Sequence, residues 1–67
     1  MELQDYLGKD VKILTINGRT FYGHVITFTP LLDTDDELYD EIGVMVGEDL
    51  IDFRENGIAM ITIIKKE

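Results

Sequence analysis

The chain has 67 residues, of which 45% are hydrophobic, and it contains no cysteine. This length is close to the lower limit for a domain held together by its hydrophobic core, and the lack of cysteine excludes a disulfide framework and a thiolate nucleophile. Fourteen acidic residues against six basic ones give a formal net charge of −8, which works against binding the phosphates of nucleic acid. The chain starts with acidic and polar residues, unlike a signal peptide, and no apolar run reaches the roughly eighteen residues of a membrane span. We therefore predict one cytoplasmic domain over residues 1–67, with no membrane contact.

The first predicted element is a short amphipathic helix over about residues 2–7. Leu3, Tyr6 and Leu7 have the i, i+3, i+4 spacing that places apolar side chains on one face of a helix. Gly8 follows directly, and a glycine at this position commonly ends a helix with a positive φ. We expect the helix to act as a lid, with Leu3 and Leu7 covering apolar side chains of a sheet.

Two strands are predicted next, over residues 11–16 and 20–29, because both runs are rich in β-branched and aromatic residues. Between them Asn17-Gly18 predicts a type I′ hairpin turn, whose two central residues need positive φ. Gly23 interrupts the second strand, and a missing side chain there predicts a sharp bend or bulge. Pro30 ends the strand, since proline has no N–H to donate to a ladder.

The segment of residues 31–41 has six acidic residues and no basic one, which predicts an exposed acidic loop. Within it Asp33, Asp35 and Glu37 alternate as the first ligands of a calcium-binding loop do. Such a loop also needs a glycine at its sixth position and a glutamate at its twelfth, where this chain has leucine and valine. We therefore expect a solvated loop and neither a metal site nor another cofactor.

Three further strands are predicted over residues 42–46, 50–53 and 58–64, separated by turns at Gly47-Glu48-Asp49 and at Glu55-Asn56-Gly57. The second Asn-Gly pair predicts another tight hairpin. Five strands in a meander, one of them bent, predict an all-β fold with a short N-terminal helix, in the form of a strongly bent small β-barrel.

Alternation along the strands divides the apolar residues into two sets. The set predicted to fill the barrel is Val11, Ile13, Phe21, Val25, Ile42, Val44, Ile51, Phe53, Ile61 and Ile63. The set predicted to point the other way is Leu14, Ile16, Tyr22, Ile26, Phe28, Met45, Met60 and Ile64. The second set is too apolar for an ordinary surface, which predicts an exposed patch or an open strand edge, and hence self-association.

The order of elements and several motifs resemble the Sm-like superfamily of Sm, LSm and Hfq-like proteins. The motifs are Leu3-x-x-Tyr6-Leu7-Gly8-Lys9-x-Val11 at the entry to the first strand, then Asn17-Gly18-Arg19, Gly23, Val25 and Phe28 around the first hairpin. The resemblance implies a homo-oligomeric ring in which the fourth strand of one subunit pairs with the fifth strand of the next. The residues it implies at the subunit interface are Leu50, Met60, Thr62 and Ile64.

In the family that the chain resembles, two loops hold RNA bases. One loop has an aspartate and a nearby asparagine after the second strand, and the other has a basic pair between the last two strands. This chain has Thr29 and Asp33 at the first place, and Arg54 and Asn56 at the second. The chain departs from the family's pattern at both places, and the RNA contacts that we predict by position are Thr29, Arg54 and Asn56, with Tyr22 as an aromatic neighbour that can stack on a base.

No enzymatic activity is predicted. His24 is the only histidine, and nothing in its sequence spacing brings a nucleophile or a second metal ligand to it, so we expect it at the surface or at a subunit interface. We expect a non-enzymatic, ring-forming binding module that holds short single-stranded RNA or nucleotides. The alternative is a scaffolding ring that has lost the RNA site and binds a basic protein partner through its acidic loop.

Overall fold

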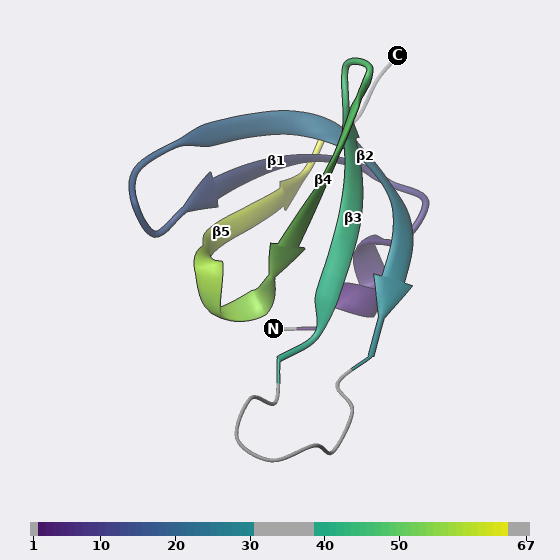
Figure 1. Cartoon of the computed structure of the whole chain (residues 1–67), viewed down its shortest axis with the longest axis horizontal. Coiled ribbons are helices and arrows are strands. Elements are labelled where there is room, and N and C mark those ends of the chain that lie inside the picture. The colour runs from purple at the N-terminus through teal and green to yellow at the C-terminus, as the bar shows by residue number, and fades with distance from the viewer. Residues whose placement is uncertain (1, 31–38, 65–67) are drawn as a thin grey trace.

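The computed structural model describes residues 2–30 and 39–64. Figure 1 shows a strongly curved sheet with a short helical turn packed at one end. In chain order the elements are the 3-10 helix η1 (Leu3–Tyr6), β1 (Asp10–Thr15), β2 (Thr20–Thr29), β3 (Glu41–Val46), β4 (Asp49–Arg54), the 3-10 turn η2 (Glu55–Gly57) and β5 (Ile58–Ile63). The predicted all-β fold with five strands is confirmed. Over the described residues, no helix has the length and apolar character needed to cross a membrane.

The sheet is antiparallel throughout, with its strands in the order β4-β3-β2-β1-β5. The first four strands follow one another as a meander, but β5 crosses to the far end and pairs with β1, where Ile13 lies opposite Ile61 and Leu14 opposite Met60. The predicted five-strand meander is therefore wrong at its last strand. As a result β4 and β5, which are consecutive in the sequence, form the two ends of the sheet.

The connection from β4 to β5 explains this crossing. The predicted Asn56-Gly57 hairpin is absent, and a 3-10 turn takes its place. Positive φ values, which a type I′ turn requires, belong to Gly8, Gly18 and Gly47 among the described glycines, and Gly57 is not one of them. Backbone hydrogen bonds to distant parts of the chain stabilise this turn. The Glu55 N–H donates to the carbonyl of Asp40 at 2.9 Å, and the Ile16 N–H donates to the carbonyl of Gly57 at 3.1 Å.

The first hairpin forms where it was predicted, but with a different turn. The Thr15 N–H donates to the Arg19 carbonyl at 2.8 Å, and the Gly18 N–H donates to the Thr15 carbonyl at 3.0 Å. The loop therefore has three residues, with Gly18 in the left-handed region at a φ of 88°. The side chain of Thr15 completes the turn, since its hydroxyl oxygen accepts from the Arg19 N–H at 3.0 Å and contacts the side chain of Asn17.

Strand β2 bends in its middle, as Gly23 predicted. Its first half pairs with β1 and its second half with β3, and His24 is the residue shared by the two registers. In Figure 1 this strand arcs over the top of the molecule and joins its two sides. A β-carbon at Gly23 would lie 2.6 Å from Cγ1 of Val44 and would overlap the carbonyl of Met45, so β3 can approach only because residue 23 has no side chain. The register shift follows just after, between Val25 and Thr27.

The N-terminal element is a single 3-10 helix, shorter than the predicted amphipathic helix. Gly8 follows its cap residue with a φ of 81°, which confirms the predicted role of this glycine. Leu3 is fully buried, whereas the side chain of Leu7 is 48% exposed, so the prediction that Leu7 covers the sheet is wrong. Leu7 lies just after the helix, with an extended backbone conformation, so its side chain does not share the face of Leu3.

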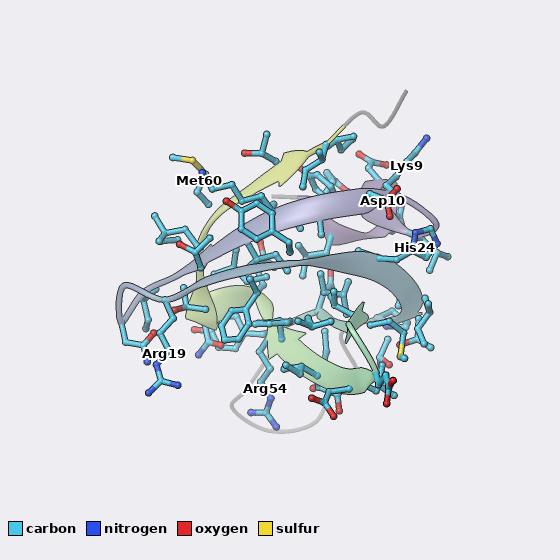
Figure 2. All side chains as sticks on the ribbon, turned by 90° about the horizontal axis from the view of Figure 1, so that it is seen from above. Lys9, Asp10, Arg19, His24, Arg54 and Met60 are labelled. Atoms are coloured by element: carbon cyan, nitrogen blue, oxygen red, sulfur yellow. The ribbon has the colours of Figure 1, made fainter. Side chains whose placement is uncertain are left out.

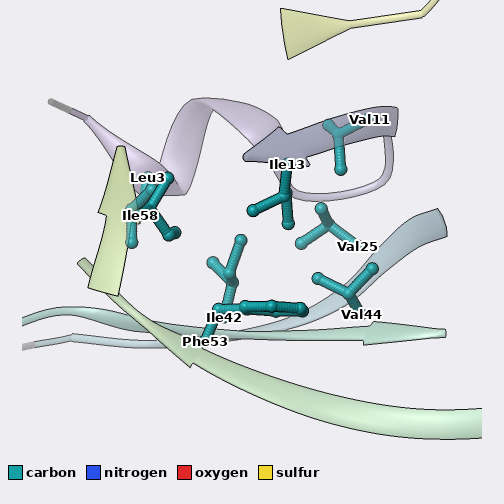
Figure 3. Close-up of a cluster of buried hydrophobic side chains, with 8 residues drawn as sticks. All are labelled: Leu3, Val11, Ile13, Val25, Ile42, Val44, Phe53 and Ile58. Atoms are coloured by element: carbon teal, nitrogen blue, oxygen red, sulfur yellow. The ribbon is translucent and has the colours of Figure 1, made fainter. Parts of the chain in front are cut away.

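The core lies inside the curve of the sheet and is closed at one end by η1 (Figure 3). Its buried side chains are Leu3, Val11, Ile13, Val25, Ile42, Val44, Phe53 and Ile58. The rings of Phe21 and Phe53 meet edge to face, with centroids 5.3 Å apart. Two assignments of face were wrong: Phe28 packs against the core, and Ile63 is 45% exposed. The bulge in β2 turns Phe28 inward, and Ile63 sits at the end of the sheet with no further strand beside it.

Candidate functional site

The RNA site implied by the sequence resemblance falls at one end of the sheet. Thr29 lies opposite Glu41, and Glu41 lies opposite Arg54, so the register places the three residues in one row across β2, β3 and β4. The row thus brings Thr29 and Arg54 onto the same part of the surface with a carboxylate between them. Nε of Arg54 lies 3.6 Å from Oε1 of Glu41, and the arginine side chain is 60% exposed.

The surroundings of Arg54 are acidic. The turn η2, which carries exposed Asn56, starts with Glu55, and the backbone bond from Glu55 to Asp40 brings a further carboxyl-bearing residue to this end. An ion pair with Glu41 and two acidic neighbours reduce the positive potential that a phosphate would meet at Arg54. Most of the predicted acidic loop, residues 31–38, lies outside the described residues.

Tyr22 does not join this group. It lies in the first half of β2, opposite Lys12 of β1, whereas Thr29 is the last residue of the same strand. The two residues are seven positions apart along the strand, on the order of 23 Å of chain at about 3.3 Å per residue, and the strand bends between them. The cations are also dispersed, since Arg19, Arg54 and Lys9 occupy separate parts of the surface in Figure 2. The structure therefore brings together three of the four predicted RNA contacts, Thr29, Arg54 and Asn56, and separates Tyr22 from them.

The residues predicted at a subunit interface all belong to the two ends of the sheet. Leu50 is on β4 and is 55% exposed, and Met60 is on β5 and is 58% exposed. Thr62 is also on β5, and Ile64 follows that strand directly. The two strands that carry Leu50, Met60 and Thr62 each have a neighbour on one side only in the described sheet.

A second polar site lies on the outer face of the sheet. Asp10 and His24 are direct cross-strand partners of β1 and β2, and Nδ1 of His24 lies 3.0 Å from Oδ1 of Asp10. The two side chains line a surface pocket of about 260 Å³ together with Tyr22, Met45 and Ile64. Figure 2 shows Asp10 and His24 side by side at the edge of the molecule opposite Arg19.

Sequence reasoning missed this pair because fourteen positions separate the two residues and only the register of β1 against β2 brings them together. The available signal was the hairpin itself, since a three-residue loop centred on Asn17 pairs Asp10 with His24. Over residues 2–30 and 39–64, no group of three or more histidine and acidic side chains is arranged to hold a metal ion. The Asp10–His24 pair thus offers a carboxylate and an imidazole for hydrogen bonding.

No protein-family model, no curated protein and no solved structure matches this chain.

Proposed function

We propose that the protein is a non-enzymatic binding module that assembles through the two ends of its sheet and presents an acidic surface to a basic partner. The observation that carries the assembly is the strand order. With β4 and β5 at opposite ends, each carries a row of backbone N–H and C=O groups on its outer side that pairs with no described strand. A second copy can supply the missing neighbour.

The side chains on these two strands support the same proposal. Leu50 and Met60 are both more than half exposed, and an apolar edge strand is the kind of surface that proteins otherwise blunt with charge or proline. Because β4 and β5 are different surfaces, a contact between β4 of one copy and β5 of the next joins copies head to tail. Such contacts form a closed ring when the rotation from one copy to the next brings the last copy back to the first. This is the arrangement that the resemblance to Sm-like proteins implies.

The assembly is tested by native mass spectrometry on protein purified without nuclease. We expect a closed oligomer for the parent chain and a monomer for Met60→Lys, which places a charge in the joint between copies. Ile26→Lys is the matched control, because Ile26 is 44% exposed and lies on β2, the middle strand of the sheet. A parent chain that is monomeric at all concentrations overturns the assembly.

The kind of partner follows from charge. A net charge of −8 and the pairing of Arg54 with Glu41 favour a basic protein over a nucleic acid. Single-stranded RNA held by Thr29, Arg54 and Asn56 is the competing function, and it predicts an affinity that falls with added salt and a weaker salt dependence in Arg54→Ala. If the native mass spectrum of the parent chain contains bound nucleotide and that of Arg54→Ala does not, the partner is RNA and not a basic protein.

A further inference from the structure

The pocket beside Asp10 and His24 has a polar end, at which a carboxylate contacts an imidazole. An ionised carboxylate can only accept hydrogen bonds, so the 3.0 Å contact between Nδ1 of His24 and Oδ1 of Asp10 places a proton on Nδ1. In the neutral imidazole, Nε2 then carries a lone pair and is an acceptor. The His24 side chain is 47% exposed and lines the pocket, so this acceptor is accessible to a ligand that brings hydrogen-bond donors.

The other walls of the pocket are apolar. Tyr22 is 59% exposed, which leaves much of its side chain available for contact, and Met45 and Ile64 add aliphatic and thioether surface. Ile64 is fixed beside Asp10, because its N–H donates to the Asp10 carbonyl at 2.8 Å. The volume of about 260 Å³ lies below the roughly 300–1,000 Å³ of sites for drug-sized ligands, so the pocket suits a single side chain or ring.

The charges around the pocket favour a cation. Asp10 contributes a carboxylate from β1, and exposed Glu48 and Asp49 follow the pocket-lining Gly47 at the β3–β4 turn. Two bases oppose them: Lys12 is the cross-strand neighbour of Tyr22, and exposed Lys9 precedes Asp10 and lies beside it in Figure 2. Three acidic residues against these two described bases, in a chain of net charge −8, leave a negative local charge that repels phosphate and attracts a positive group.

We propose that this pocket binds the guanidinium group of an arginine side chain from the basic partner. A guanidinium is planar, weakly hydrated and rich in donors, so it can stack on Tyr22 while it donates to Nε2 of His24, with its charge stabilised by Asp10. A lysine ammonium is more strongly hydrated and cannot stack in this way. The inference rests on the proposed basic partner, but it does not depend on assembly through the sheet ends.

The test is an NMR titration of the isotope-labelled full chain with N-acetyl-arginine methylamide. The control probe is the citrulline analogue, which has nearly the same shape but no charge. We expect saturable shifts in the millimolar range for the backbone amides of Tyr22, His24 and Gly47 with the arginine probe, and no saturable shifts with citrulline. Equal binding of both probes, or shifts centred elsewhere, overturns the proposal.

Two variants and a matched control sharpen the titration. Tyr22→Ala should weaken arginine binding about two- to fivefold, the factor that corresponds to a cation–π contact at an exposed site. Asp10→Asn should weaken it by a similar factor. Tyr39→Ala, which removes a tyrosine that is 44% exposed and does not line the pocket, should leave binding unchanged.

The possible results test the arginine pocket and the proposed function independently of each other. A chain that is monomeric by native mass spectrometry yet binds arginine overturns the ring and supports the pocket. A polyarginine peptide that binds the parent chain, Tyr22→Ala and Asp10→Asn with equal affinity supports the basic partner and overturns the pocket. A single-stranded oligoadenylate that shifts these amides when the arginine probe does not would assign the pocket to nucleic acid, and so would also overturn the proposal.

Discussion

The middle of the sheet and its two ends differ in what they bury. In β2 and β3, the side chains of Val25, Ile42 and Val44 are fully buried within one chain. In β4 and β5, Leu50 and Met60 remain more than half exposed, although they lie in strands of the same sheet. The end strands also contribute Phe53 and Ile58 to the core, so a single copy leaves only their exposed side chains and open backbone edges without a neighbour. Substitutions of buried residues should therefore act on folding, and substitutions of exposed apolar residues on the end strands should act on association.

The largest effect is expected in the middle, at Gly23. In Gly23→Ala the new methyl group meets the backbone of β3, which cannot move aside as a flexible side chain can. Overpacking of this kind costs about 3 kcal/mol of unfolding free energy, so the melting temperature should fall by on the order of 10–20 °C. Thermal unfolding followed by circular dichroism measures this shift.

Gly57→Ala is the control for this prediction. A β-carbon at Gly57 meets nothing within 4 Å, and the residue has no positive φ, so the melting temperature should stay within a few degrees of the parent value. If both alanine variants melt together, the close approach of β3 to Gly23 does not limit stability, and the bend in β2 must have another cause.

The second prediction compares the same substitution in the middle and at an end. Ile42→Ala removes a fully buried side chain from β3 and should cost about 2–5 kcal/mol of unfolding free energy. Ile63→Ala acts on a side chain of β5 that is 45% exposed, and should cost less than about half as much. Urea unfolding measures both.

Repeating the urea series over a tenfold range of protein concentration separates folding from association. Stability supplied by assembly changes with concentration, whereas stability within one chain does not. We expect the loss in Ile42→Ala to be independent of concentration. A loss in Ile63→Ala that equals the loss in Ile42→Ala in a dilute monomer would remove the distinction between middle and ends.

The smallest effect is expected at the ion pair between Glu41 and Arg54. Both side chains are partly exposed, and such pairs contribute about 0–1 kcal/mol, so Glu41→Gln should change the free energy of unfolding by less than about 1 kcal/mol. Its effect on binding is more informative. If Glu41 limits the access of phosphate to Arg54, the variant should bind single-stranded RNA more tightly than the parent at low salt, as read by fluorescence anisotropy.

Glu48→Gln is the control for charge alone, because it removes the same negative charge from the exposed β3–β4 turn. An equal gain in RNA affinity in Glu41→Gln and Glu48→Gln would show that overall charge decides, and that the row of Thr29, Glu41 and Arg54 has no particular role.

The candidate sites were predictable only where neighbours in sequence are also neighbours in space. The turn at Asn17-Gly18 and the end of the first helix at Gly8 were found, because a glycine with positive φ is a local requirement. Arg54 was predicted as a site residue from the resemblance, but its carboxylate partner was not predicted, since the register of β3 against β4 decides that Glu41 lies opposite. Asp10 and His24 were not paired for the same reason.

By itself, the sequence determined the class of fold, the position of most strands and the bend at Gly23, because alternation, β-branched residues and glycine act over a few residues. Only the tertiary structure decided which strand β5 joins. The turn Glu55–Gly57 is held by distant backbone groups of Asp40 and Ile16, and it directs the chain away from β4 and toward β1. That long-range choice creates the open ends of the sheet and places Ile64 beside Asp10 in the pocket.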